Sequence, residues 1–190
     1  ELFTAVPWII QDNLYSFLEN TFIKKGTYDE FVLQQIQEVV KNIEDNLIKT
    51  IKENDINIAC KTEDLSWFVP KGVLIHVFYN LFNNSIYWID KRRKFAEVDN
   101  VYAYSGKDQI IVEIYGDDII VYDTGTGVIR TMEDILFEPL ESGKPNHEGR
   151  GMGLYIVKKI LNSFNANIEL LSERNLYGNR YKFLVSMIDE

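Results

Sequence analysis

The sequence is poor in cysteine and histidine and has no long apolar run. Its single cysteine, Cys60, excludes an internal disulfide and suits a reducing compartment, and we expect it to be a small core residue. No apolar run approaches the roughly 20 residues that span a bilayer, so we expect no membrane segment. No signal peptide is visible, although a truncated start would hide one. We expect a cytoplasmic chain, whose full-length protein could be membrane-attached through a missing N-terminal part.

The net charge and the length of the chain limit the class of protein and its domain organisation. A net charge of -9 argues against a nucleic-acid surface. A chain of 190 residues can bury a sizeable core and suits one α/β domain with a helical appendage. Accordingly, we predict a helical segment over residues 1–54 and a globular domain over residues 55–190.

The first segment contains two stretches of helical apolar spacing, residues 2–22 and 31–51. A helical hairpin that leads into a larger domain has the layout of a dimerisation element. Alternatively, the two helices pack on the domain or on each other without any dimer. The sequence leaves both interpretations open.

A glycine-rich run near the C-terminal end leads into an apolar, helix-like segment. The run is Gly149-Arg150-Gly151-Met152-Gly153-Leu154. The unpaired N–H groups of a first helical turn and the helix dipole favour an anion there, so such a loop can bind phosphate. Taken alone the pattern is weak, because glycine-rich turns before helices also arise as plain connections.

A second glycine pattern, Asp123-Thr124-Gly125-Thr126-Gly127, follows a strand-like run at residues 119–122. A carboxylate at a strand end can accept a hydrogen bond from the amino group of a flat base. The two glycines let a ring or sugar pack against bare backbone. The alternative is a turn with an Asx-type hydrogen bond from Asp123.

Upstream of both glycine patterns, residues 71–89 have the apolar spacing of a helix. His76, Asn80 and Asn84 are four residues apart and therefore share one stripe of it. An asparagine oxygen can serve Mg²⁺, which takes oxygen ligands and keeps waters and phosphate oxygens. The alternative is a solvated face with ordinary amides.

In this order, the three elements resemble the GHKL ATP-binding family. A fourth motif, Ile135-Leu136-Phe137-Glu138-Pro139-Leu140 with Lys144 after it, resembles the F-box of sensor histidine kinases. The run Asn80-Leu81-Phe82-Asn83-Asn84-Ser85 is close to their N-box. The resemblance covers roughly residues 56–188 and is closest to the catalytic domain of those kinases.

The resemblance implies ATP and Mg²⁺ as cofactors and gives each motif residue a role. It implies that Asn84 holds the metal and that Asn80 approaches the phosphates or the metal's waters. It further implies that Asp123 takes the adenine amino group and that residues 128–148 form a mobile lid. The remaining implied nucleotide-binding residues are Gly125, Gly127, Lys144, Gly149, Arg150, Gly151, Met152, Gly153 and Leu154.

One position separates kinases from ATPases of this family. ATPases carry a glutamate four residues before the metal-binding asparagine, whereas this chain has Asn80. An amide cannot act as a general base at neutral pH, and phosphoryl transfer depends chiefly on positioning and charge. We therefore predict a histidine kinase that transfers the γ-phosphoryl group in two-component signalling. The alternative is a nucleotide-dependent switch or slow ATPase that controls a partner or dimer.

Two features depart from the kinase pattern. Tyr87 stands where a lysine or arginine usually faces a phosphate, so the cation could come from Lys91, Arg92, Lys144 or Arg150. Neither His76 nor His147 lies in a helical hairpin, so we expect the acceptor histidine upstream or on a partner chain. A response regulator and a homodimer are the further expected partners. The basic run at residues 91–94 either complements the helix dipole or contacts phosphate.

The expected architecture is an α+β sandwich, the Bergerat ATP-binding fold, with a mixed and largely antiparallel sheet. The predicted strands are residues 56–60, 109–115, 119–122, 167–172 and 180–188. Helices at residues 71–89 and 151–164 would cover one face of the sheet.

Overall fold

The structure is a computed structural model that describes residues 28–31, 51, 55–62, 67–145 and 151–188. The helix predicted at residues 2–22 lies outside this part of the chain, and of the helix predicted at residues 31–51 only the two end residues, Phe31 and Ile51, lie within it. Phe31 belongs to a strand, so the second prediction begins too early at that residue.

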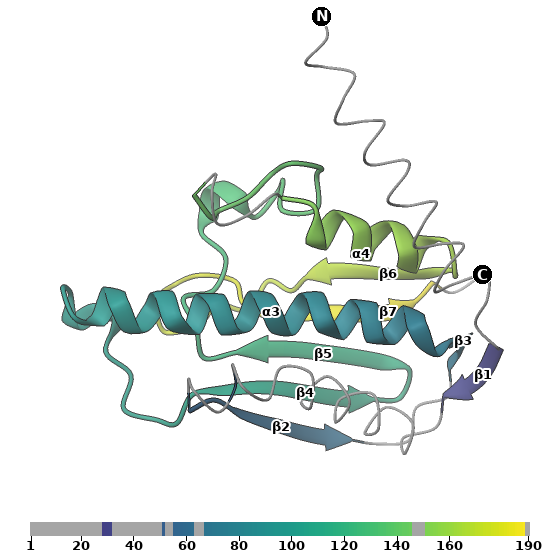
Figure 1. The fold of residues 1–190 in the computed structure, drawn as a ribbon, viewed down its shortest axis with the longest axis horizontal. Helices are drawn as coiled ribbons and strands as arrows, with labels where there is room; N and C mark the ends of the chain where they lie inside the picture. The colour runs from purple at the N-terminus through teal and green to yellow at the C-terminus, as the bar shows by residue number, and fades with distance from the viewer. Residues whose placement is uncertain (1–27, 32–50, 52–54, 63–66, 146–150, 189–190) are drawn as a thin grey trace, which may run out of the picture.

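A five-stranded mixed sheet forms the centre of the domain, in the order β2-β4-β5-β7-β6 (Figure 1). Strands β2 and β4 are parallel, and every other neighbouring pair is antiparallel. The predicted α+β fold with a largely antiparallel sheet is therefore confirmed. The strands are β2 (Asn57–Thr62), β4 (Gln109–Tyr115), β5 (Asp118–Asp123), β6 (Ala166–Leu170) and β7 (Phe183–Met187).

Two helices pack against this sheet and supply much of the apolar core. Helix α3 (Lys71–Ala96) lies over the sheet with its axis roughly along the strands, and α4 (Gly153–Asn162) lies against β6 and α3 (Figure 1). The predicted apolar face of α3 is buried throughout, and α4 buries one side of its length. These buried residues are Val73, Leu74, Val77, Phe78, Leu81 and Phe82 on α3 and Ile156, Val157, Ile160 and Leu161 on α4.

Helix α3 continues seven residues beyond its predicted end at Ile89, and its basic run lies in these last turns. Ile89 and Arg92 are buried there, so the inner face of the helix continues through the charged stretch. The apolar spacing that predicted residues 71–89 stops at this basic run, and the buried partner of Arg92, Asp108, lies 16 residues further along the chain.

A second, two-stranded sheet was not predicted. Strand β1 (Tyr28–Phe31) pairs antiparallel with β3 (Trp67–Pro70), and Trp67 and Val69 are buried. Helix α3 begins at Lys71, directly after β3 ends. The small sheet joins residues on both sides of the boundary predicted between residues 54 and 55.

The remaining elements are two short 3-10 helices, and one prediction, that for Cys60, differs from the structure. The 3-10 helices are η2 (Asn100–Tyr102) and η3 (Arg130–Met132). Cys60 is exposed on β2, so its prediction as a core residue is wrong. Strand β2 lies at one edge of the sheet, and an edge strand has a neighbouring strand on one side only.

Candidate functional site

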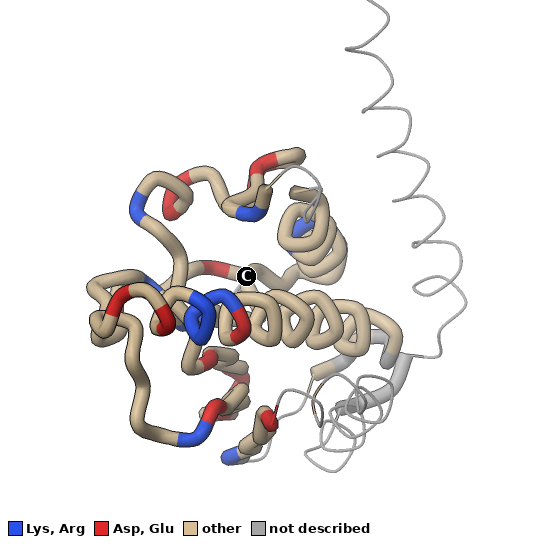
Figure 2. The backbone as a smooth tube through the Cα atoms, turned by 60° about the vertical axis from the view of Figure 1, so that its left-hand side comes forward, with Lys and Arg blue, Asp and Glu red and all other residues tan. Residues whose placement is uncertain are grey.

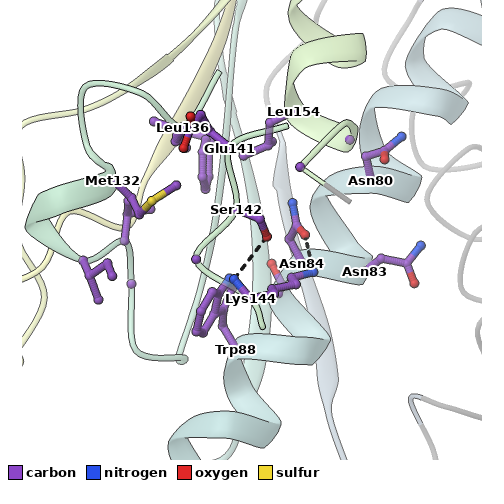
Figure 3. Close-up of a pocket in the computed structure, with 18 of the residues that line it drawn as sticks. Asn80, Asn83, Asn84, Trp88, Met132, Leu136, Glu141, Ser142, Lys144 and Leu154 are labelled. Carbon is purple, nitrogen blue, oxygen red and sulfur yellow. Dashed lines mark hydrogen bonds between the residues drawn. The ribbon is translucent and has the colours of Figure 1, made fainter. Parts of the chain in front are cut away.

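A cavity of about 330 Å³ lies between α3, the lid segment and the start of α4 (Figure 3). This volume is within the usual range of small-molecule sites. The predicted residues that line it come from four separate stretches of the chain. They are Asn80, Asn84, Asp123, Gly127, Lys144, Gly151, Met152, Gly153 and Leu154.

Asp123 ends β5 and presents a carboxylate to the cavity. Its Oδ1 accepts a hydrogen bond from the backbone N–H of Gly125 at 2.8 Å. Burial raises the pKa of Asp123 to about 6, and the hydrogen bonds from Ser85 and Gly125 oppose the rise. The group is therefore ionised at neutral pH and can accept a hydrogen bond, although its proton affinity is higher than usual.

A buried ionic cluster holds the residue after Asp123. Thr124 Oγ1 donates to Asp108 Oδ1 at 2.9 Å and accepts from the N–H of Gln109 at 3.1 Å. Asp108 also binds Arg92 and Arg93, each at 2.6 Å. Neither arginine lines the cavity, so the predicted phosphate contact is not seen for them. Arg93 also lies in the last turn of α3, where its charge complements the helix dipole as predicted.

The opposite side of the same loop is held by the turn before β7. The side-chain amides of Asn175 and Asn179 donate to the carbonyl of Thr126 at 3.1 and 2.9 Å. Gly127 has φ +72°, and a Cβ there would meet the Arg180 carbonyl oxygen at 2.8 Å. Only glycine fits this position without strain. Gly125 does not line this cavity, and a Cβ there would be 2.7 Å from Asp123 Oδ1 and 2.9 Å from the carbonyl carbon of Trp88.

Asn80 lies at the α4 end of the cavity. Its Nδ2 donates to the backbone carbonyl of His76 at 2.9 Å and is 3.2 Å from His76 Nε2. Burial lowers the pKa of His76, so the ring is neutral and its Nε2 can accept from the amide. A Cβ on Gly153 would come within 2.8 Å of Asn80 Oδ1, so the glycine leaves room for this amide. His76 and Asn80, which were predicted to share one face of the helix, are therefore in direct contact.

Asn84 lies one turn further along α3 and binds a cation from the lid segment. Lys144 Nζ donates to Asn84 Oδ1 at 2.8 Å and lies 4.3 Å from the centre of the Tyr87 ring (Figure 3). The amide oxygen of Asn84 thus already accepts from a cationic group. The donor therefore fits Mg²⁺, which prefers oxygen ligands.

The glycine-rich run brings the lid segment against the start of α4. Gly151 has φ +66°, and its carbonyl accepts a hydrogen bond from the N–H of Leu140 at 3.0 Å. Helix α4 begins at Gly153, and the side chain of Met152 gives it no cap. Its first N–H groups suit an anion. Gly149 and Arg150 lie outside the described residues.

Sequence reasoning missed the apolar walls of the cavity. Trp88, Met132 and Phe183 line it, together with Leu136 from the F-box-like motif. Trp88 follows Asn84 by one helical turn, and that spacing could have identified it. Met132 ends a 3-10 helix in an irregular segment, where no periodicity gives a signal.

The charged groups of the cavity come from loops and a strand end. Between Gly72 and Ile89, α3 carries no Lys, Arg, Asp or Glu, and apart from Lys71 these residues gather near its C-terminal end (Figure 2). Asp123, Glu141 and Lys144 supply the charges of the lining. Over the described ranges, no three His, Cys, Asp or Glu residues group as a metal centre. No described helix is long and apolar enough to cross a membrane.

The profile of the family described as "Histidine kinase-, DNA gyrase B-, and HSP90-like ATPase" matches residues 70–187. The match covers more than half of the chain, and the chain belongs to this family, as the sequence motifs predict. A sequence comparison with curated proteins gave no match.

Solved structures of histidine kinases share the fold. A mycobacterial sensor histidine kinase, MprB, is 14% identical with a TM-score of 0.58, covering 85% of this chain and 97% of its own. The Acinetobacter baumannii kinase AdeS is 18% identical with a TM-score of 0.61, covering 95% and 76%. The nucleotide-free catalytic domain of the kinase ThkA is 19% identical with a TM-score of 0.60, covering 85% and 95%. At these identities the similarity concerns the fold alone.

Proposed function

We propose that this chain is the ATP-binding catalytic domain of a sensor histidine kinase. It transfers the γ-phosphoryl group of ATP to a histidine outside this chain, in two-component signalling. The observation that carries the proposal is the amide of Asn80 at the phosphate end of the cavity, hydrogen-bonded to His76. An amide cannot deprotonate water, so this position favours a phosphoryl acceptor with its own nucleophile.

The base end of the cavity binds adenine in this proposal. The carboxylate of Asp123 accepts from the exocyclic amino group, while Trp88, Met132 and Leu136 give apolar walls for a flat ring. The hydrogen bonds of Thr124 to Asp108 and of Asn179 to the Thr126 carbonyl hold the loop after this carboxylate in place before the ligand binds. Such preorganisation lowers the entropy lost on binding.

The phosphate end binds charge. Asn84 offers an oxygen to Mg²⁺, Lys144 offers an ammonium, and the N–H groups at the start of α4 face an anion. Bound Mg²⁺ would neutralise charge on the phosphate oxygens. Because phosphoryl transfer depends chiefly on positioning and charge, these groups supply its main requirements.

The acceptor histidine and the response regulator belong to other parts of the system in this proposal. His76 contacts Asn80 inside the domain, so it is poorly placed as an acceptor. We place the acceptor in a helical domain upstream or on a partner chain. Residues 1–54, apart from β1, are proposed as a helical dimerisation segment that precedes the ATP-binding domain at 55–190.

A second function is favoured by one residue. Glu141 lines the same cavity and is a carboxylate that could orient water. The alternative is a slow ATPase or a nucleotide-dependent switch that controls a partner or dimer without histidine phosphorylation.

Incubating the full-length protein with γ-labelled ATP and Mg²⁺ separates the two functions. A protein label that is acid-labile and base-stable supports the kinase, and Asp123→Asn should abolish it. Absence of label, together with phosphate release that Glu141→Gln removes or with nucleotide-dependent dimerisation, supports the alternative and contradicts the kinase.

A further inference from the structure

A lysine and a tyrosine meet at the Asn84 end of the cavity. Lys144 Nζ is 2.8 Å from Asn84 Oδ1 and 4.3 Å from the centre of the Tyr87 ring. Asn84 and Tyr87 are neighbours on one face of α3, whereas Lys144 comes from the lid segment. Figure 3 shows Lys144 beside Asn84, with a dashed line for the hydrogen bond between them.

Both contacts recognise a positive charge. An amide oxygen accepts from an ammonium, and the face of an aromatic ring attracts a cation. A second ammonium, that of Lys91, lies 5.2 Å from the same ring. The Tyr87 ring is therefore a place where cations gather, and it lies one turn after the proposed metal ligand.

We propose that Lys144 is an exchangeable cation of the Asn84 site and that Tyr87 is the positioning residue that keeps it there. In the nucleotide-free protein the ammonium occupies the Asn84 oxygen. When a divalent cation binds with nucleotide, Lys144 leaves that oxygen. This inference rests on the proposed role of Asn84 as a metal ligand.

The exchange follows from charge and geometry. Mg²⁺ binds an oxygen at about 2.0–2.1 Å, so a metal and an ammonium on one oxygen would be only a few ångströms apart. Like charges at that distance repel in a partly buried site. The bond from Lys144 Nζ to Asn84 Oδ1 joins the lid segment to α3, and the backbone N–H of Lys144 donates to Ser142 Oγ at 3.1 Å within the lid segment. Loss of the Asn84 bond on metal binding therefore removes one tie between the lid segment and α3, and the two events are coupled in both directions.

The test compares ADP affinity with Mg²⁺ and with a chelator, by calorimetry, because ADP allows no turnover. The ratio of the two dissociation constants is the metal enhancement. Lys144→Met removes the competitor and should raise the enhancement by about threefold or more, the effect expected of a partly exposed cation–π contact. Tyr87→Leu should act in the same direction, and Tyr87→Phe, which keeps the ring face, should match the wild type.

Two control variants keep the lid contact intact. Lys94→Met removes an exposed lysine of α3 that pairs with Asp90, and Tyr79→Leu removes an exposed tyrosine of the same helix. Neither should change the metal enhancement. Amide hydrogen exchange over residues 138–145 without nucleotide gives a second measurement. Exchange should be faster in Lys144→Met and Tyr87→Leu but not in Tyr87→Phe.

The outcomes separate this inference from the proposed function. If Asn84→Ala removes the metal enhancement while Lys144→Met and Tyr87→Leu leave it unchanged, Lys144 is no competitor and the inference is overturned. The metal role of Asn84 then stands. If Asn84→Ala keeps the enhancement, the metal assignment itself is wrong. Should Tyr87→Leu fail to fold, Lys144→Met alone decides.

Discussion

Thr124 Oγ1 donates a hydrogen bond to Asp108 Oδ1 at 2.9 Å, which ties the residue after the cavity carboxylate to a buried ionic cluster. The side chains of Arg92 and Asp108 in this cluster are only 4% and 7% exposed. Breaking a buried charge pair is strongly destabilising. The position of Asp123 therefore depends on residues that never line the main cavity.

Replacing Thr124 by valine keeps its shape and removes both hydrogen bonds of its hydroxyl. We expect the free energy of unfolding to fall by about 1–3 kcal/mol, because Asp108 and the Gln109 N–H lose a buried partner. Adenosine affinity should also fall. Urea denaturation and calorimetry measure the two effects, and Thr124→Ser should restore both. A stability loss with unchanged affinity would mean that the cluster does not position Asp123.

Adenosine binding should weaken as the pH falls through about 6, the pKa to which burial raises Asp123. Below that pH the carboxyl group is protonated and no longer serves as a full acceptor. Adenosine avoids the titration of the ATP phosphates, and titrations between about pH 5.5 and 8 cover the transition. This range also stays above the sequence pI of about 4.8. An affinity that is independent of pH would exclude Asp123 as the base acceptor.

Asp123→Asn should abolish ATP binding, because its amide can present a donor to the adenine amino group. The same substitution should stabilise the nucleotide-free protein at neutral pH. A pKa raised from 3.8 to about 6 means that protonated Asp123 favours folding. That stability is fully present below pH 3.8 and is lost as the pH rises through about 6.

The variant lacks this pH-dependent loss. Its advantage over the wild type should therefore grow with pH and reach about 1–3 kcal/mol above pH 7. Urea denaturation at acidic and neutral pH measures the difference. An equal effect at both pH values would contradict a buried charge at Asp123.

Gly153→Ala should reduce ATP affinity without unfolding the domain. Alanine suits a helix better than glycine, but its Cβ would lie 2.8 Å from Asn80 Oδ1 and displace that amide. Thermal unfolding should be unchanged or improved, while calorimetry shows weaker binding. In an Asn80→Ala background the same change should have little further effect, because the clashing atom is gone. Additive losses would place the effect of Gly153 elsewhere.

Local patterns predicted most of the fold. The apolar spacing of Val73, Phe78 and Phe82 identifies α3, and the Asp-x-Gly-x-Gly motif identifies the end of β5, because these signals lie within a few neighbouring residues. Strand β1 was missed because a four-residue strand without a long alternating pattern carries little local information. The exposure of Cys60 depends on strand order, which composition does not reveal.

The sequence predicted individual residues of the candidate site but not the contacts between them. Asn84 and Lys144 were both identified, yet their contact joins residues 60 positions apart. The basic run at residues 91–94 was visible, but Asp108, the partner of Arg92 and Arg93, was not. Such pairs depend on tertiary packing, which periodicity and motif spacing do not report.

Strand β3 continues directly into helix α3. Pro70 ends the strand and Lys71 begins the helix, so the small β1–β3 sheet and the helix that carries Asn80 and Asn84 share one continuous backbone. Because no residue separates β3 from α3, the direction in which β3 leaves the small sheet also fixes the direction in which the first turn of α3 begins. The pairing of β1 with β3 therefore helps to orient the helix that carries Asn80 and Asn84.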